Sequence, residues 1–293
     1  MTTAEKIVNG ATTFLQSVAT FGKCLLMSRR AFPAPSGLRE RPAIVMGNGP
    51  SLNDMLSRNP RAIRESDLMA VNFAPNAALF YDLKPSMLVL ADPHFFYGMD
   101  KDPNVARLWK RIGAVSWPMS LYVPVGHQAR VRTLLTGPDG KSNANITIKP
   151  FNLTPAEGYR GLRLALYRQG TAMPRPRNVL IPAIMIALRE GYRDIRLTGA
   201  DHSWSRTLWV DDMNRVISIQ PHFYPDTEKE RERVAKEYEG YHLHHIFNSL
   251  AVAFRSYFDI ADYAETIGAK ITNCTPGSFI DAFPRGDIDS PQQ

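Results

Sequence analysis

Short apolar runs alternate along most of the chain with longer segments in which apolar residues recur at helical spacing. Strands of a parallel sheet are buried on both faces and therefore have a continuous apolar character. Their alternation with helical segments is typical of a sheet that helices cover on both faces. The pattern predicts an α/β fold with a single Rossmann-like, doubly wound and mostly parallel sheet.

The apolar runs place the individual elements. Helical patterns cover Leu52–Asn59 and Val179–Arg189, and a long one runs from the histidines at 242–245 to about Ile267. The strand order of the middle of the chain, residues 115–177, stays open. The predicted strands are Ala43–Met46, Asp67–Val71, Met87–Ala91, Ile195–Gly199 and Lys270–Asn273, with strand-like pieces at Val115–Trp117, Leu121–Val125 and Ile146–Phe151.

The start of the chain carries one apolar stripe with alternating spacings of four and three residues. Such a stripe predicts an amphipathic helix. The segment lacks the charged start and cleavage site of a signal peptide, so we expect it to be retained. The stripe either packs on the chain's own core or a partner subunit, or lies on the inner membrane leaflet with help from Arg29-Arg30. Its members are Ile7, Ala11, Phe14, Val18, Phe21 and Leu25.

The chain divides into four parts. The N-terminal amphipathic helix (1–32) precedes a linker with Pro, Gly and Ser (33–42), an α/β domain (43–285) and a tail (286–293) that we expect to be frayed. Residues from about 205 to 240 form an excursion beyond a strand end, where lids over substrates are commonly found. This lid includes a predicted hairpin (208–219) and a charge-rich predicted helix (227–239).

Composition narrows the class of protein. The 293 residues, 44% of them hydrophobic, can bury a large α/β core, and no run approaches the roughly 20 apolar residues needed to cross a bilayer. Cys24 and Cys274 offer neither a disulfide framework nor a metal-knuckle spacing, which indicates a reducing, cytoplasmic compartment. The net charge of +7 comes from scattered Lys and Arg without a nucleic-acid motif. An anionic small ligand or a membrane surface suits this charge better than nucleic acid.

The first predicted strand leads directly into Gly47-Asn48-Gly49-Pro50-Ser51. Glycines at this position supply positive φ and let a ligand approach the backbone closely. Ser51 can cap a helix whose free N–H groups attract an anion. The lysine of a Walker loop and the third glycine of a dinucleotide fingerprint are missing. The turn therefore indicates either a nucleotide-type ligand or an ordinary strand-to-helix turn.

Other predicted strands also end in polar residues. Asn72 follows the second strand, Asp92 follows the third, and a later strand leads into Asp201-His202-Ser203-Trp204. Ligands of open α/β sheets bind outside the carboxyl ends of the strands. We therefore expect these residues to converge with the glycine turn on one pocket, although each of them alone can also be explained as a turn or cap.

These blocks resemble two known families. The glycine turn, Asn72, Asp92 with its following aromatic residues, and Gly191–Asp201 resemble the bacterial CMP-sialic-acid-dependent sialyltransferases. Cys274–Ser278 resembles their closing motif before a last helix. A broader family related to archaeal 6-hydroxymethylpterin diphosphokinases shares the Gly-Asn-Gly-Pro-Ser and Gly-x-Asp blocks. The resemblance covers the nucleotide-binding blocks and the C-terminal third, but neither the first forty residues nor the middle.

The sialyltransferase resemblance implies a nucleotide-sugar transferase fold with a mobile lid, which holds a CMP-sugar at the strand ends without a metal or other cofactor. Asp92 replaces a family asparagine, and its carboxylate would repel an anionic sugar unless a basic residue intervened. A family Ser-Gly pair is also missing, with Val179–Pro182 in its place. The residues expected to hold the donor are Gly47, Asn48, Gly49, Pro50, Ser51, Asn72, Asp92, Thr198, Gly199, Asp201, Trp204 and Ser278.

Transfer to an acceptor hydroxyl needs a base, and the ordinary pKa of histidine near 6.5 suits this role. His244 is expected near the buried stripe of the long helix and is the first choice, with His245 and His202 as alternatives. This stripe is predicted from Phe247, Leu250, Phe254, Tyr257 and Phe258. A core position is the other interpretation of such a histidine.

Metal binding has less support. His242 and His245 could bind zinc together with His222 or Asp201, but no thiolates or regularly spaced carboxylates accompany them. Asp287-Ile288-Asp289 resembles an Asp-x-Asp metal motif but lies in the expected tail. No metal is predicted.

The sequence thus predicts a glycosyltransferase that moves a sugar from a nucleotide donor, CMP-linked by preference, to a bacterial surface polysaccharide or other glycan acceptor. One alternative is a diphosphotransferase of the 6-hydroxymethylpterin diphosphokinase type, which would depend on ATP and Mg²⁺. The other is a non-catalytic nucleotide- or glycan-binding component, which would bind a ligand without turnover. The expected location is the cytoplasm, at the inner face of the membrane if the first helix binds lipid.

Overall fold

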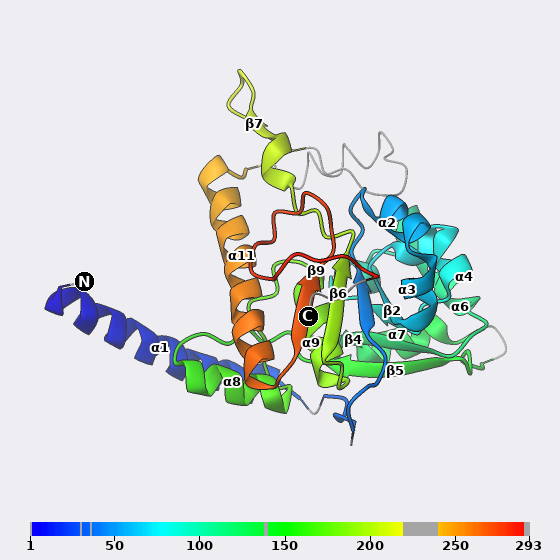
Figure 1. The fold of residues 1–293 in the computed structure, drawn as a ribbon, viewed down its shortest axis with the longest axis horizontal. Helices are drawn as coiled ribbons and strands as arrows, with labels where there is room; N and C mark the ends of the chain where they lie inside the picture. Colours follow the sequence, from blue (N-terminus) through cyan, green and yellow to red (C-terminus); the bar gives the residue numbers. More distant parts are fainter. Residues whose placement is uncertain (1, 30, 36, 138–139, 219–239, 290–293) are drawn as a thin grey trace.

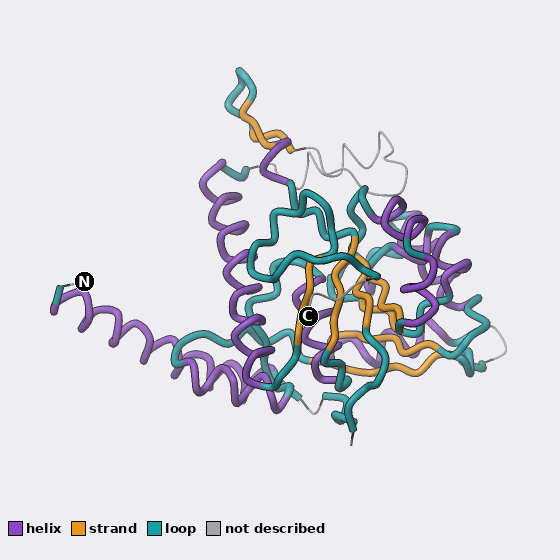
Figure 2. Tube along the Cα trace, viewed as in Figure 1, coloured by secondary structure: helices purple, strands orange, loops and turns teal. Residues whose placement is uncertain are grey.

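A seven-stranded sheet forms the centre of the protein, with helices on both of its faces (Figure 1, Figure 2). The structure, a computed structural model, describes residues 2–29, 31–35, 37–137, 140–218 and 240–289. Every pair of neighbouring strands in this sheet is parallel, which confirms the predicted fold class. The strands are β1 (Ala43–Met46), β2 (Asp67–Val71), β3 (Met87–Val89), β4 (Met119–Pro124), β5 (Ile146–Phe151), β6 (Asp194–Thr198) and β9 (Lys270–Asn273).

The strand order is β5-β4-β3-β2-β1-β6-β9. From β1 the chain builds outward through β2 to β5, and then returns to place β6 on the other side of β1. The direction of winding therefore reverses between β1 and β6, which makes this pair the topological switch point of the sheet. Ligands of doubly wound folds bind in the crevice outside the carboxyl ends of the strands at such a point.

Two layers of helices enclose the sheet. Apolar side chains of α8 (Arg160–Gln169), α9 (Leu180–Arg189) and α11 (Leu243–Thr266) form the core on one face. The other face is covered by α2 (Leu52–Arg58), α3 (Pro60–Glu65), α4 (Leu79–Leu83), α5 (His94–Tyr97), α6 (Pro103–Gly113) and α7 (Gln128–Leu135). Short 3-10 helices lie at η1 (Ala74–Asn76), η2 (Val125–His127) and η3 (Trp204–Thr207).

The residues of β1 show why a strand in this position is apolar throughout. Ala43 and Val45 belong to the core under α9 and α11, whereas Ile44 and Met46 belong to the core on the opposite face. Successive side chains of a strand point to opposite faces, so a strand with helices on both sides buries all of them. All four residues are buried.

Two predictions about individual elements differ from the structure. Residues 115–117 are not a strand: they form the loop between α6 and β4, in which Val115 is buried in the core. The apolar character of this loop comes from its core contacts and not from pairing in a sheet. On α11, Phe247 and Phe258 were expected in the buried stripe, but about half of each side chain is exposed, 49% and 51%.

The ends of the α/β domain also differ from the expectation. The first helix, α1 (Thr3–Met27), is amphipathic as predicted, but Phe32 belongs to the core of the domain and not to the helical part. The tail was expected to be frayed from residue 286, whereas Ile288 is fully buried and its carbonyl oxygen accepts a hydrogen bond from Arg196. The side chain of Ile288 thus packs in the same hydrophobic core as residues of the strands. Between β9 and Asp289 the described chain contains no helix, so the last helix implied by the family resemblance is absent there.

The predicted lid is described only in part. Its hairpin is confirmed, since β7 (Leu208–Val210) pairs antiparallel with β8 (Val216–Ser218). The charge-rich segment 227–239 lies outside the described residues. Within the described ranges, none of the helices combines the length and the apolar character needed to cross a bilayer.

Candidate functional site

The glycine turn after β1 and the exit of β6 are bonded directly to each other. The N–H of Gly47 donates to the carbonyl of Thr198 at 2.7 Å, and the N–H of Gly49 donates to the carbonyl of Gly199 at 2.8 Å. The structure thus brings Gly47–Ser51 and Thr198–Asp201 together at the switch point.

The two glycines of the turn are required by this contact. A Cβ on Gly47 would overlap with the carbonyl oxygen of Gly199, and a Cβ on Gly49 would overlap with the carboxylate of Asp201. Neither glycine has a positive φ, in contrast to the sequence-based expectation. Their small size therefore serves the close approach of two strand exits, and the ligand is not needed to explain them.

Ser51 differs from its predicted role as a helix cap. Its hydroxyl donates to Oδ2 of Asp201 at 2.8 Å and makes no cap bond to α2. The main-chain carbonyl of Asp201 accepts a hydrogen bond from Phe279 N–H at 2.9 Å. The carboxylate of Asp201 is therefore held by the glycine turn, while the neighbouring Pro50 is exposed.

Asn48 and Asn72 bring two unpaired acceptors to this edge of the sheet. The Oδ1 atoms of both side chains are buried and have no hydrogen-bond partner. Nδ2 of Asn48 donates to Val71 at 3.3 Å, and Asn72 adopts a left-handed backbone with φ of 50°. A buried acceptor without a donor costs free energy. Both oxygens thus fit a ligand that supplies hydroxyl or N–H groups, whereas a phosphate oxygen could not satisfy them.

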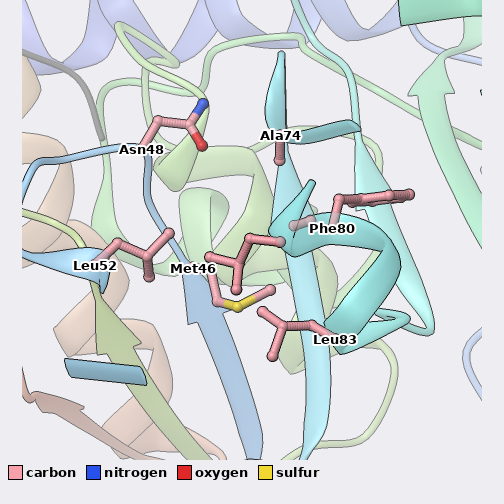
Figure 3. Close-up of a pocket in the computed structure, with 8 residues that line it drawn as sticks. Met46, Asn48, Leu52, Ala74, Phe80 and Leu83 are labelled. Atoms are coloured by element: carbon pink, nitrogen blue, oxygen red, sulfur yellow. The ribbon is translucent and has the colours of Figure 1, made fainter. Parts of the chain in front are cut away.

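A shallow apolar depression lies beside Asn48, between the ends of β1 and β2 and helix α4. It encloses about 280 Å³, part of which is open to solvent. In Figure 3 the side chains of Met46, Phe80 and Leu83 gather below Asn48. The depression provides an apolar wall next to the asparagine. Its lining consists of Met46, Asn48, Leu52, Ala70, Ala74, Leu79, Phe80 and Leu83.

Thr198 ends β6 at the centre of this site. The residue is fully buried, and its Oγ1 has no hydrogen-bond partner. Gly199 follows with φ of 60°, and a Cβ there would come within 2.6 Å of the carbonyl oxygen of Gly47. The backbone at the exit of β6 is thus fixed by a position that only glycine tolerates.

Two of the expected donor-binding residues have structural partners instead. Ser278 donates to the carbonyl of Ala200 at 2.6 Å and accepts from Asn273 at 3.0 Å, which ties the segment after β9 to the exit of β6. Asp92 is exposed, and its Oδ1 accepts from the N–H of His94 at 2.8 Å at the start of α5. Asp92 also follows β3, which is two strands away from β1.

His202 is buried against α11 and is a poor base. Its Nε2 lies 2.6 Å from the hydroxyl of Tyr257, which gives its own hydrogen to Oδ1 of Asn178 at 2.9 Å. Nε2 must therefore carry the proton and donate it to Tyr257. Burial lowers the pKa of His202 to about 3, and Trp204 covers the ring at a centroid distance of 4.1 Å. Neither Tyr257 nor Asn178 was predicted from the sequence as a partner of His202, although an Asn immediately before an apolar helical run is a recognisable helix-start signal.

His244 and His245 are exposed in the first turn of α11. The prediction that His244 lies near the buried stripe is wrong for this structure. His245 accepts the N–H of His242 on Nδ1 at 3.2 Å, and its ring lies 3.9 Å from that of His244. Helix α11 begins on the side of the molecule where the strands end (Figure 1). The structure does not bring either histidine into contact with the switch point.

The metal alternative gains no support from the described part of the chain. There, no three side chains of His, Cys, Asp or Glu are grouped closely enough to hold a metal ion. His222, which was considered as a zinc ligand, lies outside the described residues.

Comparison with known proteins reveals a shared fold and no sequence relative. No model of a known protein family matches the sequence, and no curated protein matches it. The fold is similar to that of the MAf glycosyltransferase from Magnetospirillum magneticum AMB-1, with a TM-score of 0.52 and 12% identity over 94% of this chain and 39% of that one. A mammalian sialyltransferase aligns with a TM-score of only 0.34 and 12% identity, over 80% of this chain and 76% of the other.

The first of these comparisons shows the class of fold. The protein has the α/β architecture found in a glycosyltransferase, and it spans 39% of the length of that enzyme. At such low identity the likeness concerns the fold alone, and the function must be argued from the site.

Proposed function

We propose that the protein transfers a sugar from a nucleotide-sugar donor to a glycan acceptor. The observation that carries this proposal is the position of the glycine turn and Asp201 at the β1/β6 switch point, beside the unpaired Oδ1 atoms of Asn48 and Asn72. Nucleotide ligands of doubly wound folds occupy this position. The fold shared with a glycosyltransferase supports the same assignment.

The two asparagines would bind the hydroxyl groups of the donor. Ribose and sugar hydroxyls can donate to an amide oxygen, and a pair of unpaired oxygens on adjacent strands suits a polyhydroxylated ligand. The preference for a CMP-linked sugar, and for transfer without a metal or other cofactor, rests on the resemblance of the strand-end motifs to sialyltransferases.

In the proposed reaction, the acceptor oxygen bonds to the anomeric carbon while the bond from that carbon to the nucleotide phosphate oxygen breaks. The hydroxyl proton passes to a base. His244 remains the proposed base because it is exposed at the start of α11 on the ligand side of the sheet. His202 is the weaker candidate, since burial and its pKa of about 3 make it a poor proton acceptor.

A thermal-shift panel with CMP, UDP, GDP and ATP, each with and without Mg²⁺, tests the ligand class. A ligand at 100 times its Kd stabilises the folded state by about 2.7 kcal/mol. We expect CMP to raise Tm without Mg²⁺. A shift with ATP and Mg²⁺ alone would instead identify a diphosphotransferase, and a shift without turnover of any CMP-sugar would identify a binding component.

The role of Asn72 can be tested without straining the backbone. Asn72→Gly removes the amide but keeps a residue that tolerates the φ of 50°. We expect the CMP-induced shift to disappear while the Tm of the free protein changes little. Asn214→Gly is the matched control, because Asn214 also has a positive φ (57°) but lies exposed in the turn between β7 and β8. An unchanged CMP shift in Asn72→Gly would remove Asn72 from the site.

A further inference from the structure

Helix α1 contacts the domain through small and polar side chains. The hydroxyl of Ser17 accepts the N–H of Tyr159 at 2.9 Å. The hydroxyl of Thr20 donates to the carbonyl of Glu157 at 3.0 Å and accepts the N–H of the same residue at 2.9 Å. Both Ser17 and Thr20 are buried. The side of α1 that faces the protein is therefore its polar side.

The apolar stripe of α1 faces solvent. On an ideal helix Val18 points about 160° away from Thr20 and about 100° away from Ser17. The stripe thus does not pack on the chain's own core, which was one of the two interpretations of the sequence. Nine large apolar side chains of α1 are each more than half exposed: Ile7 67%, Val8 62%, Phe14 55%, Leu15 65%, Val18 54%, Phe21 56%, Leu25 67%, Leu26 76% and Met27 59%.

The first half of α1 also projects beyond the domain, as Figures 1 and 2 show. A lone helix of about 12–15 residues is marginally stable in water, and most helices gain their stability by burying an apolar face. Gly10 and Gly22 lower the intrinsic stability of α1 further, by about 1 kcal/mol each relative to alanine. The helix therefore needs something that covers its stripe.

The charges near the stripe favour a lipid surface. Between Glu5 and Glu40 the sequence contains no acidic residue, whereas Lys6, Lys23, Arg29 and Arg30, within or just after the helix, are basic. Basic residues that flank an apolar helix face attract it to anionic lipids, each by about 1 kcal/mol near the surface.

A second copy of the chain fits the stripe less well. Val8 and Leu15 widen the apolar arc to about 140° from Phe21 to Val8, which exceeds the narrow seam of a coiled coil. The positions on the other flank of the seam, Ser17 and Cys24, already contact the domain. None of these flanking residues is charged, although charges there usually determine how coiled coils pair.

We propose that α1 binds the surface of an anionic lipid bilayer, with the stripe from Ile7 to Leu25 in the acyl boundary and the domain on the side of the helix that carries Ser17 and Thr20. The site concerned is separate from the β1/β6 switch point, so this inference does not depend on the proposed function.

The test is co-sedimentation of the full chain with vesicles of phosphatidylcholine that contain about 30% phosphatidylglycerol, compared with phosphatidylcholine alone. We expect binding to the mixed vesicles, weaker binding to the neutral ones, and a loss of binding as salt is added. Helicity measured by circular dichroism should rise on binding. Equal binding to both vesicles would overturn the anionic requirement, and no binding to either would overturn the proposal.

Two variants place the binding on the stripe. Phe14→Asp should weaken vesicle binding roughly 10- to 100-fold, because the buried aromatic surface is lost. Gln16→Asp adds the same charge on the opposite side of the helix and should bind with nearly the affinity of the parent protein. Equal losses in both variants would mean that charge alone is responsible. A twofold molecular mass in light scattering that Phe14→Asp abolishes, without vesicle binding, would assign the stripe to a second copy.

Discussion

At the scale of single residues, Gly49 has no room for a side chain, since a Cβ would overlap with the carboxylate of Asp201 and lie 2.7 Å from the carbonyl oxygen of Gly199. Gly49→Ala must therefore push the two strand exits apart. We expect a loss of about 1–3 kcal/mol in the free energy of unfolding, typical of overpacking, measured by urea denaturation. Gly161→Ala on α8 is the control, because a Cβ there meets nothing within 4 Å; it should be neutral or stabilising by up to about 1 kcal/mol. Equal stability of the Gly49 variant and the parent would show that the exits separate freely.

His202 makes stability depend on pH. Its pKa falls from 6.5 to about 3 on folding because the ring is buried. Between these two values the unfolded chain binds a proton that the folded protein does not, so stability is full above about pH 6.5 and decreases as the pH falls.

We therefore expect the parent protein to lose about 2 kcal/mol more than His202→Asn when the pH is lowered from about 7.5 to about 5. Asparagine tolerates the left-handed backbone at this position, where φ is 50°. The carboxylates titrate in both proteins, so their contributions cancel in the difference. Urea denaturation at the two pH values measures it, and identical losses would show that His202 is protonated in the folded state.

Residue roles were predictable only where they follow from position along the chain. That Asn72 and Asp201 lie at strand ends is evident from the apolar runs before them. The partner of Ser51 and Gly49 was not predictable. Both residues contact Asp201, and Asp201 lies 150 residues after Ser51 in the chain. The turn formed by Asp92 is local, because its carboxylate accepts the N–H of His94 two residues later, which is a common turn pattern.

At the scale of elements, the first helix and the segment after it have different relations to the domain. Phe32 is 4% exposed and packs edge-on against Tyr122 at a centroid distance of 5.3 Å. Its carbonyl accepts from Nη2 of Arg189 at 2.9 Å. The first half of α1 projects from the domain (Figure 1). The boundary that matters for stability therefore lies inside the segment 1–32.

Two truncations test this boundary. Deleting residues 2–15 should leave the free energy of unfolding of the domain within about 0.5 kcal/mol of the parent, since the side chains lost are exposed apart from the partly buried Thr13. Deleting residues 2–32 also removes Phe32 from the core and should cost about 3–5 kcal/mol. Urea denaturation of both proteins measures the difference. If the shorter deletion were equally destabilising, the first half of α1 would be part of the core.

Elements with a continuous apolar run were predicted well because both faces of the sheet are covered. The bounds of β1 and β2, which are almost entirely apolar, agree with the sequence-based ranges. The segment Val115–Trp117 also contains two large apolar residues but forms a loop, in which Nε1 of Trp117 donates to the carbonyl of Pro85 at 2.9 Å. Apolar composition alone cannot distinguish a strand from a buried loop when both are short.

At the scale of the whole molecule, the strand order was the part that the sequence could not provide. Local patterns reveal the strands but not their neighbours, and the return of β6 to the side of β1 depends on contacts across about 150 residues. This return creates the switch point and thereby the candidate site. The amino-terminal end of β6 lies at the opposite edge of the sheet from this site, and the buried Glu190 is located just before it.

Glu190 joins several parts of the fold. Its carboxylate accepts from Lys149 at 2.7 Å, Tyr122 at 2.8 Å and Arg39 at 3.0 Å, and the side chain is 3% exposed. Burial alone would raise the pKa of Glu190, but the hydrogen bonds from Lys149 and Tyr122 outweigh it and leave the pKa below its ordinary value. The carboxylate is thus a stabilising anion above the pKa of an unfolded glutamate, and its contribution is lost as the pH falls below that value.

Substitutions at the two ends of β6 should therefore have separate effects, one on stability and the other on ligand binding. Glu190→Gln leaves Lys149 without its anion and should lower the free energy of unfolding by roughly 2–4 kcal/mol, yet the folded variant should keep the CMP-induced rise in Tm, because Glu190 lies before β6 and the proposed site lies after it. Glu65→Gln, which removes an exposed pair with Arg61, should change stability by less than about 0.5 kcal/mol.

Asn72→Gly should show the reverse of Glu190→Gln, with stability kept and the CMP shift lost. Circular dichroism verifies folding at the temperature of the binding assay, and a folded Glu190→Gln variant that no longer responds to CMP would show that the two ends of β6 are coupled.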